Sequence, residues 1–442
     1  MLQALRNAFR VPEVRNKLLF TFFILVVYQF ATHIPVVGVD KTALNSVLES
    51  DVAGGFVGVL NLLSGGAVSN FSVLANGVYP YITASIIFNL LTPVIPALEA
   101  LQREPGGQEK LQRYTYYLTI PMAVLQSIGQ IAIFSGVGGA AIIPGFGTDV
   151  LLTISVVATM VAGSMFAVWL GELITEQGIG NGISIIIFAG IVATAPLNLF
   201  NLLTSNPERL GYNLVMFLLI LMLSIFAIIY IQEGVRRIPV QYGKRVRGNK
   251  QYQMGRGQYI PLKVNPVGMI PLIFAQAIIV FPAVVVSLFN PQPGQFGYEI
   301  QQAFGNQQGL LYWGTFFLMT VTFTFFYADV MVGQYRLAET LQRQGGFIPG
   351  IRPGKKTEDY IVRTTRRITF VGALFLGLIA IVPGIVDFIN QILYPLESLS
   401  AQNNPAMVLS GAGLIIVVGV VIDTLRQLEA QLVMRNYEGF MR

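Results

Sequence analysis

The stretch "SNFSVLANGVYPYITASIIFNLLTP", residues 69–93, is apolar enough to predict a helix that crosses a membrane. It follows "GFVGVLNLLSGGAV", residues 55–68, which is almost as apolar. The run Phe56–Leu63 cannot cross a membrane alone, because as a helix it would cover about 12 Å of the roughly 30 Å hydrocarbon core. The sequence therefore predicts a short re-entrant segment, joined to a full span through the Ser-Gly-Gly of residues 64–66.

The composition around this stretch is that of an integral membrane protein. Hydrophobic residues make up 54% of the 442 residues and charged residues only 11%, whereas soluble domains carry about 25% charged residues. Backbone that faces lipid must be helical or form a closed barrel. Ten apolar windows approach the length of a helical span and predict ten transmembrane helices: Leu18–Ile34, Val73–Leu91, Tyr116–Phe134, Leu151–Leu170, Ile183–Leu203, Leu214–Ile231, Val267–Leu288, Leu310–Val332, Ile368–Ile389 and Val408–Asp423.

The distribution of lysine and arginine favours the same count. These residues concentrate in the cytoplasmic loops of membrane proteins, and with ten spans all but Lys41 and Arg209 of the 28 fall on one side. That side also carries both chain ends and is predicted to be cytoplasmic. A cleaved signal peptide is the alternative interpretation of residues 1–34, but the apolar run ends in "ATHIPVVG" and no small-residue cleavage site follows it.

The predicted spans divide the chain into an N-terminal half, residues 1–205, and a C-terminal half, residues 206–442. Five spans in each half force the halves into opposite orientations, as in inverted-repeat membrane proteins. No residue-level repeat relates the halves, so a ten-helix bundle without a repeat stays open as an alternative. Two long basic loops, at about 233–266 and 334–367, predict a cytoplasmic face that a partner recognises.

Several classes of chemistry are missing from the sequence. The chain has no cysteine and a single histidine, His33, which argues against thiol chemistry, histidine-based catalysis and histidine metal sites. We therefore expect no catalytic residues, no metal and no cofactor. An inverted-repeat secondary transporter of a small solute is the main alternative function, but it predicts charged residues near the middle of the membrane, and none cluster there.

Uncharged polar residues do occur inside the predicted spans. Hydrogen bonds between membrane helices are worth roughly 0.6 to 2 kcal/mol each, enough to hold helices together and weak enough to release them. The residues are either ordinary contacts of a helix bundle or a latch along a seam that opens: Thr83, Ser85 and Asn89 in the second span, Gln126, Ser127 and Gln130 in the third, and Gln276 in the seventh.

Glycine and proline mark two further places. "ITEQGIGNGIS", residues 174–184, places three glycines within five residues at a helix entry, without the strand or lysine of a phosphate-binding loop. It predicts close approach of backbones or a bend. The seventh span carries Pro266, Pro271 and Pro282, which predict bends because proline removes helix hydrogen bonds.

Five stretches together resemble the SecY family, whose members are the central subunits of bacterial and plastid protein-conducting channels. They are "NLLSGGAVSNFSVLANGVYPYITASII", "GIGNGISIIIFAGIVA", "IPLKVNPVGMIPLIFAQAIIVFP", "GGFIPGIRPGKKTEDYI" and "IIVVGVVIDTLRQLEAQLVMRNYEGF". The resemblance runs from "RVPEVRNKLLFT" near the start to the last predicted helix. It implies an all-α membrane fold, with ten helices in two inverted five-helix halves that meet like a clamshell around a pore.

The resemblance also implies roles for residues along that pore. A ring of aliphatic side chains would form its narrowest point and exclude hydrated ions by dewetting. By motif match, the ring falls on Val78, Ile82, Ile183, Ile187, Ile273 and Ile416. Because Ile183 and Ile187 lie early in the fifth span, they can reach the middle of the membrane only if the preceding glycine segment is sunk in a cavity.

In the family, the short apolar run is a plug that folds back beneath the ring, and the glycines after it are a hinge; a turn lying on the surface is the alternative. The plug and hinge would comprise Phe56, Leu60, Leu63, Ser64, Gly65 and Gly66. A lateral gate between the second and third spans and the seventh and eighth would release signal sequences into lipid. Its residues would be Thr83, Ser85, Asn89, Gln126, Gln130, Gln276 and Phe281.

The family's partners follow from the same resemblance. They are the small membrane subunits SecE and SecG, the motor ATPase SecA, the ribosome, signal peptides and nascent chains, and the lipid bilayer. The cytoplasmic loops would bind the motor or ribosomal RNA through Arg352, Arg247, Lys250 and Arg256. The expected location is the bacterial inner membrane, with a thylakoid membrane as the alternative.

Overall fold

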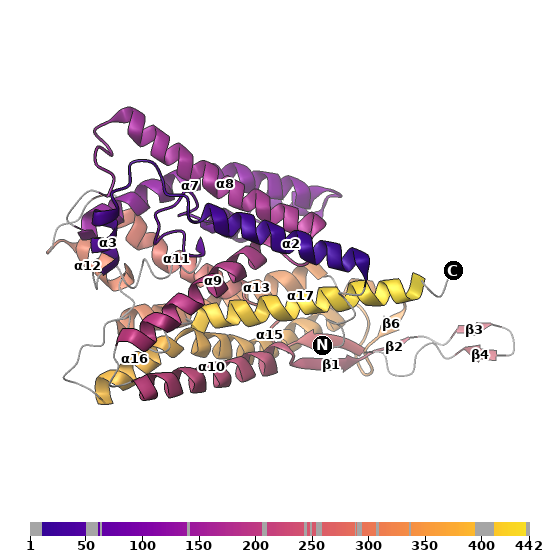
Figure 1. Cartoon of the computed structure of the whole chain (residues 1–442). Helices are drawn as coiled ribbons and strands as arrows, with labels where there is room; N and C mark the ends of the chain where they lie inside the picture. The colour runs from indigo at the N-terminus through magenta and orange to yellow at the C-terminus, as the bar shows by residue number, and fades with distance from the viewer. Residues whose placement is uncertain are drawn as a thin grey trace.

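Apolar helices build almost all of this protein. The computed structural model of the 442-residue chain describes residues 11–49, 61, 64–138, 142–205, 210–242, 245–247, 250–252, 259–287, 289, 294–305, 309–335, 337–393 and 411–438. In Figure 1 the long helices lie side by side, and the strands gather at one end of the bundle. We call that end the strand face. The beginning of α2 (Pro12–Ala31) and the end of α17 (Gly411–Glu438) both lie toward it.

The remaining helices of the N-terminal half precede residue 206. They are α3 (Lys41–Glu49), α5 (Tyr79–Leu91), α6 (Pro96–Arg103), α7 (Gly107–Gly138), α8 (Val150–Gln177) and α9 (Gly182–Ser205). Among the described residues, the C-terminal half contains α17 and, before it, seven other helices: α10 (Leu210–Gln232), α11 (Ile270–Ser287), α12 (Phe296–Gly305), α13 (Leu310–Tyr335), α14 (Leu337–Arg343), α15 (Lys355–Ala380) and α16 (Val382–Leu393).

Each of the ten predicted windows contains a helix. Among the described residues, α2, α7, α8, α9, α10 and α13 are each long and apolar enough to cross a membrane by themselves. α5 passes the same test only together with α6, to which it is bent by 105°. α11 is a shorter apolar helix over its described core, Ile270–Ile279, whereas α15 and α17 carry charged residues in one half of their length.

Two predicted spans begin later than their apolar windows. The second helix, α5, begins at Tyr79 and not at Val73, because residues 65–78 form a series of turns and bends. The seventh, α11, begins at Ile270 and not at Val267. Pro266 therefore precedes the helix and Pro271 lies in its first turn, where a missing N–H costs nothing. Only Pro282 interrupts the helix.

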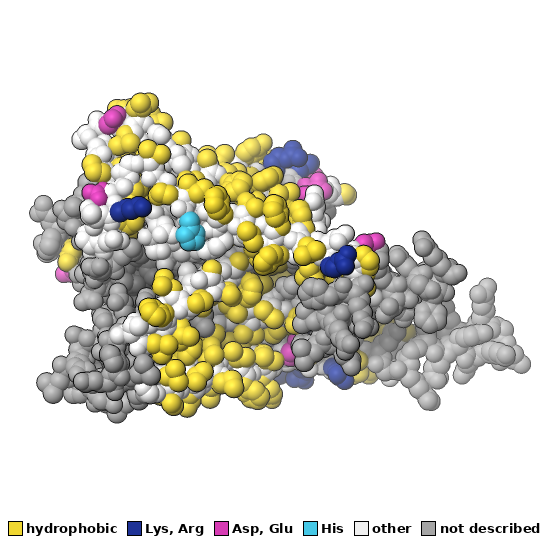
Figure 2. Space-filling view, in the orientation of Figure 1, with side chains coloured by type: hydrophobic (Ala, Val, Ile, Leu, Met, Phe, Trp, Pro, Cys, Tyr) yellow, Lys and Arg dark blue, Asp and Glu magenta, His cyan; other side chains and the backbone are white. Residues whose placement is uncertain are grey.

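Large apolar side chains cover the middle of the bundle. Figure 2 shows them spread between the two ends of the molecule. On α10, Met222, Phe226 and Tyr230 are each at least 70% exposed. Such a broad exposed apolar surface is expected where a helix faces lipid. A second set of apolar residues is fully buried and forms one core that takes residues from both halves.

Short strands occupy the segments between α10 and α11 and between α14 and α15. β1 (Val235–Pro239) pairs with β5 (Tyr259–Lys263), and β3 (Arg245–Arg247) pairs with β4 (Lys250–Tyr252), both antiparallel. β2 (Gln241–Tyr242) pairs with β6 (Gly346–Phe347), which joins the two segments. The sequence alone predicts both segments only as loops. A separate apolar cluster underlies the strands and includes Ile238, Leu262, Leu341 and Ile361.

The segment predicted as a loop at about 334–367 consists largely of helices and a strand. It contains α14, β6 and the first turns of α15, which begins at Lys355. Arg363, Arg366 and Arg367 therefore lie on a helix that continues into the apolar bundle.

The glycine segment of residues 178–182 forms a tight turn between α8 and α9. A Cβ atom at Gly182 would overlap the carbonyl oxygen of Gly171, and one at Gly178 would lie 2.5 Å from the Oγ1 atom of Thr21. Gly180 has a φ of +90°, which favours glycine. The prediction of close backbone approach is confirmed, and the turn is packed against α2.

We predict that Gly182→Ala destabilises the protein, because α9 must then move away from α8. Overpacking of this kind costs about 1 to 3 kcal/mol, which should lower the apparent melting temperature in detergent by a few degrees. Gly211→Ala in α10 is the matched control, since no atom lies within 4 Å of the added Cβ. Equal melting temperatures for the two variants would contradict the close packing.

Candidate pore and gate

The chain segment that follows the predicted plug is buried in the bundle although it is not helical. Ser64, Val68, Phe71 and Leu74 are each at most 2% exposed. Phe71 holds a φ of +41°, an uncommon conformation for a residue other than glycine. The segment therefore needs internal partners for its backbone polar groups.

The Ser-Gly-Gly sequence forms a helix ending. Gly65 has a φ of +72°, and the N–H of Gly66 donates to the carbonyl of Asn61 at 2.8 Å, which is the pattern of a Schellman cap. The Asn61 side chain also accepts from the N–H of Ser69 at 3.0 Å. The predicted plug residues Phe56, Leu60 and Leu63 lie outside the described residues, as does most of the run.

Packing fixes this helix ending against its neighbours. The Tyr28 hydroxyl of α2 donates to the carbonyl of Ser64 at 3.0 Å. A Cβ at Gly65 would lie 2.9 Å from the Cα of Gly190 in α9. Farther along, the N–H groups of Val36 and Val73 donate to the carbonyls of Phe71 and Ile34 at 3.0 and 2.9 Å. The segment is thus bonded to α2 and the chain that follows it.

The six residues predicted to form the pore ring all lie in or against one apolar core. Five are at most 7% exposed, and the sixth, Ile183, is partly buried and packs against the same core. They come from four elements: Val78 and Ile82 from the start of α5, Ile183 and Ile187 from α9, Ile273 from α11 and Ile416 from α17. All six side chains are aliphatic, and the helices that carry them come from both halves.

The halves meet along two seams. On one side, α5 and α7 contact α11; we call this the front seam. On the other side, α9 contacts α10 and α17; we call this the rear seam. The ring residues come from helices that flank both seams.

Most of the predicted gate residues are buried or partly buried near the front seam. Thr83, Gln126, Gln130 and Gln276 are 4% to 7% exposed, whereas Ser85 and Asn89 are half-buried. Phe281 differs, because its side chain is 41% exposed.

The hydrogen bonds of these residues lie mostly within one half. Gln126 of α7 donates to the Thr83 hydroxyl of α5 at 3.3 Å, and Asn89 donates to Ser85 at 3.3 Å. The other side-chain oxygen of Gln126 is buried without a hydrogen-bond partner among the described residues, and so are both polar atoms of Gln130. Gln126 thus bonds α7 to α5, and both glutamines keep spare hydrogen-bonding capacity.

One side chain that the sequence analysis did not single out bonds across the front seam. The Tyr79 hydroxyl of α5 donates to the backbone carbonyl of Ala277 in α11 at 2.9 Å, and the bond is buried. Ala277 lies just before Pro282, which interrupts the hydrogen bonding of α11. The only signal in the sequence was a tyrosine inside an apolar span, whose hydroxyl needs a buried partner.

On the strand face, Arg352 is exposed at the tip of a turn. Gly350 and Gly354 flank it with φ values of +83° and +102°, and the Thr357 hydroxyl donates to the Arg352 carbonyl at 2.9 Å. Arg247 and Lys250 belong to the paired strands β3 and β4, but their side chains lie outside the described part of the chain, as does all of Arg256.

Within the described residues, no group of three or more histidine, aspartate or glutamate side chains could hold a metal ion. The arrangement in the core is therefore an apolar cluster between two helix seams.

The chain resembles known proteins both in sequence and in structure. The model of the SecY family matches residues 72–425. The protein translocase subunit SecY of Streptomyces scabiei is 40% identical over the full length of both chains. The same subunit of Halalkalibacterium halodurans is 41% identical, again over the full length of both.

Solved structures share the fold. A protein-conducting channel matches with a TM-score of 0.64 and 18% identity, and a SecY structure concerned with its plug domain matches with a TM-score of 0.62 and 18% identity. Sec61 from the canine ribosome–channel complex of the endoplasmic reticulum matches with a TM-score of 0.61 and 17% identity. Each comparison covers 94% of this chain and 92% of the other.

We predict that Tyr79→Phe loosens the front seam without changing the packing of the ring. Loss of one buried hydrogen bond costs about 1 kcal/mol, which is roughly a fivefold change in an equilibrium. In the otherwise cysteine-free chain, Gln276→Cys should then react with a membrane-permeant maleimide about fivefold faster. Tyr81→Phe is the control, because the Tyr81 ring stacks on Tyr116 of α7 within the same half. Unchanged labelling in Tyr79→Phe would show that the Tyr79–Ala277 hydrogen bond does not hold the front seam closed.

Proposed function

This chain belongs to the SecY family, and we propose that it is a protein-conducting channel in which unfolded polypeptides pass through the apolar ring. It has the ten-helix clamshell fold of these channels. The observation that supports the proposal is that the six proposed ring residues, from helices of both halves, all belong to or pack against one buried apolar core. A transporter of small solutes is not favoured, since the relatives are translocase subunits.

The proposed ring works through its lack of polar groups. A narrow apolar constriction disfavours hydrated ions because water leaves it readily. It also offers no fixed hydrogen-bonding site that would retain a particular peptide sequence. A ring of this kind admits many polypeptides one after another and excludes ions between them.

The proposed plug would close the same passage from the face opposite the strands. Its described end is anchored at Ser64 by Tyr28 and at Gly65 by contact with α9. In a related SecY channel of known structure, the plug domain stabilises the closed state and maintains a membrane seal. The capped Ser-Gly-Gly ending supports a plug that moves as a unit about residues 64–66.

The proposed lateral gate is the front seam. Opening it separates α5 and α7 from α11, breaks the Tyr79–Ala277 bond and leaves the Gln126–Thr83 bond intact. The buried glutamines with unused polar atoms can then bond a polar backbone in the opening. This would let a signal sequence leave sideways into lipid.

The proposed partners bind at the strand face, which we take to be cytoplasmic. Two related channels were solved with ribosomes, a canine Sec61 and a yeast Ssh1 complex. The basic strands and the exposed Arg352 tip support a ribosome or the motor SecA as partner, and the exposed apolar helices suit the small subunits SecE and SecG. The bacterial inner membrane is the proposed location, with both termini in the cytoplasm.

We predict that Ile187→Ser and Ile416→Ser each raise the leak of ions through resting channels in lipid vesicles severalfold. A hydroxyl group at the constriction holds water and lowers the barrier to hydrated ions. Ile191→Ser is the matched control, because Ile191 is equally buried on α9, one turn beyond Ile187. Equal leak in the control and the ring variants would argue against the assignment of the ring.

We predict that a covalent link across the front seam blocks export. The native chain lacks cysteine, so Thr83→Cys and Gln276→Cys can be joined by a short bifunctional thiol reagent. Translocation of a signal-bearing precursor into vesicles should fall severalfold when the pair is linked. The control pair, Thr83→Cys with Gln126→Cys, joins α5 to α7 within one half, where the native side chains are 3.3 Å apart. Normal export by the fully linked seam pair would refute the lateral gate.

A further inference from the structure

The chain between α5 and α6 presents an exposed apolar surface. The two helices are bent by 105°, and residues 91–97, LTPVIPA, which we call the elbow, carry no charged side chain. Val94 is 72% exposed, and Leu91 and Ile95 are 37% and 38% exposed. A contiguous exposed apolar patch marks contact with a membrane or with another protein.

The elbow lies at the strand face. α6 contacts α7, and Gln112 near the start of α7 donates to Glu172 near the end of α8 at 3.3 Å. The turn that follows α8 packs on Thr21 of α2, whose beginning lies toward the strand face. The start of α7, and with it α6 and the elbow, is therefore at the same end of the bundle.

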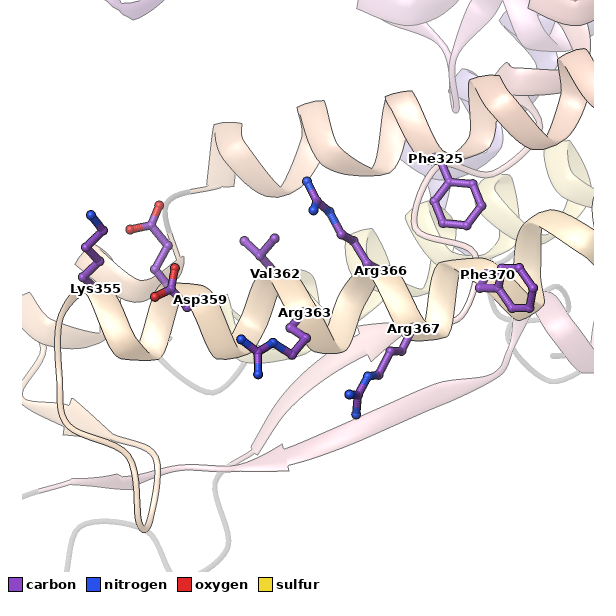
Figure 3. A pocket seen from close by; sticks show the side chains of 9 residues that line it. Phe325, Lys355, Asp359, Val362, Arg363, Arg366, Arg367 and Phe370 are labelled. Atoms are coloured by element: carbon purple, nitrogen blue, oxygen red, sulfur yellow. The ribbon is translucent and has the colours of Figure 1, made fainter.

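Charged side chains occur elsewhere on the strand face. α15 begins there, and Lys355, Asp359, Arg363 and Arg367 project from its first half in Figure 3. The elbow has no charged side chain over seven residues. It therefore suits surroundings that are less polar than water.

Aromatic side chains indicate the depth of the elbow in the membrane. Phe88 in the last turn of α5 stacks on Tyr114 of α7, with ring centroids 6.5 Å apart. Tyr114 and Tyr117 are 44% and 64% exposed, as tyrosines at a membrane–water interface are. Leu91 lies about 4.5 Å beyond Phe88 along the helix axis, at 1.5 Å per residue. This distance places the elbow in the headgroup layer, which is roughly 5 to 7 Å thick on each side of the hydrocarbon core.

The backbone of the elbow can enter this layer without leaving N–H groups unpaired. The N–H groups of Val94 and Ile95 both donate to the carbonyl of Leu91, at 3.0 and 2.8 Å, and that of Thr92 donates within the last turn of α5. The other two residues between 92 and 96 are prolines, which have no N–H. Every N–H from residue 92 to residue 96 is thus bonded or missing, which removes a main cost of placing non-helical backbone next to lipid.

α6 continues the elbow as an amphipathic helix. Ala97, Leu98 and Leu101 share one side of it, and Glu99 and Gln102 lie on other sides. The bend of 105° turns α6 across the direction of α5, which runs through the bundle. Amphipathic helices in this orientation lie in the membrane surface.

We propose that the elbow inserts into the leaflet on the strand face and anchors α5 at a fixed depth. Val94 and Ile95 lie among the lipid headgroups and the first acyl carbons, and α6 rests on the surface beside them. The exposed Tyr114 and Tyr117 continue the same surface toward the hydrocarbon core, which favours lipid over a protein partner. Because α5 contacts α11, the anchor fixes one side of the front seam. Its meaning for a lateral gate rests on the function proposed above, whereas the insertion does not.

The test measures depth in the full chain, reconstituted in vesicles of phosphatidylethanolamine and phosphatidylglycerol. The native chain lacks cysteine, so Val94→Cys or Ile95→Cys carries a single nitroxide label. Collisions of the label with oxygen, which concentrates in lipid, are compared by electron paramagnetic resonance with collisions with a water-soluble nickel chelate. The oxygen-to-nickel ratio should be severalfold higher at both positions than at Glu104→Cys, an exposed position at the other end of α6.

Two results of this measurement overturn the proposal. The elbow is in water if the label at Val94 meets the nickel chelate as readily as the label at Glu104. A protein partner covers the elbow if the label at Val94 is shielded from both reagents. Neither measurement uses translocation, so a chain that conducts no polypeptide still tests the anchor.

A second variant tests whether the elbow holds α5. Val94→Asp with Ile95→Asp should withdraw the elbow, because two carboxylates favour water and are repelled by anionic lipid. A label on Leu91→Cys should then meet the nickel chelate severalfold more often.

The control for this variant is Val150→Asp with Leu151→Asp. These residues are 71% and 79% exposed at the start of α8, at the end opposite the strand face, and their replacement should leave the label at Leu91 unchanged. An unchanged label in the elbow variant, or equal changes in both variants, overturns the anchor. The single-cysteine measurements decide the matter if the elbow variant fails to fold.

Discussion

A non-helical backbone buried in an apolar bundle is the constraint on which the rest of this structure depends. Residues 64–78 lie inside the protein without the internal hydrogen bonds of a helix. Each backbone N–H or carbonyl left unpaired in such surroundings costs several kcal/mol. Turn bonds within the segment supply part of these partners, since the N–H groups of Phe71 and Ser72 donate to the carbonyls of Val68 and Ala67. Contacts with α2, α7 and α9 hold the segment from outside. Tyr28 bonds Ser64, Gly190 packs on Gly65, and Asn76 donates to Ser127 of α7 at 2.7 Å.

These bonds make the N-terminal half a unit and leave the front seam weaker. The segment, α2, α7 and α9 are joined by buried hydrogen bonds and by glycine contacts too close for a larger residue. Across the front seam the Tyr79 hydroxyl makes a hydrogen bond worth roughly 1 kcal/mol. Apolar side chains and the buried glutamines Gln126, Gln130 and Gln276 make up much of the rest of that seam. The proposed lateral gate would open by breaking the Tyr79 bond while each half keeps its internal bonds.

The sequence predicted the helices well because their apolar windows are long, but it placed some helix starts wrongly. Hydropathy registers Val73–Val78 as part of a span, since an apolar turn and an apolar helix have the same composition. The strand pairing of Gln241 with Phe347 joins positions far apart in the chain, and no local pattern encodes it. The ring residues were predicted only through family resemblance, because isoleucine in a membrane helix is more often a packing residue than a pore residue. Tyr79 was overlooked because its partner is a backbone carbonyl, which leaves no trace in the sequence.

The strand face is joined to the front seam through elements of the C-terminal half. β2 and β6 pair segments that both belong to the C-terminal half, and a shared apolar cluster underlies them. β5 leads into α11 through a stiff turn, in which the buried Asn265 side chain accepts from the N–H of Gly268 at 3.0 Å and donates to its carbonyl at 2.9 Å. Gly372 of α15 approaches the carbonyl of Val264 so closely that a Cβ would lie 2.7 Å from it. Close contacts therefore join the strands to both α11 and α15, and α11 is the helix to which Tyr79 bonds.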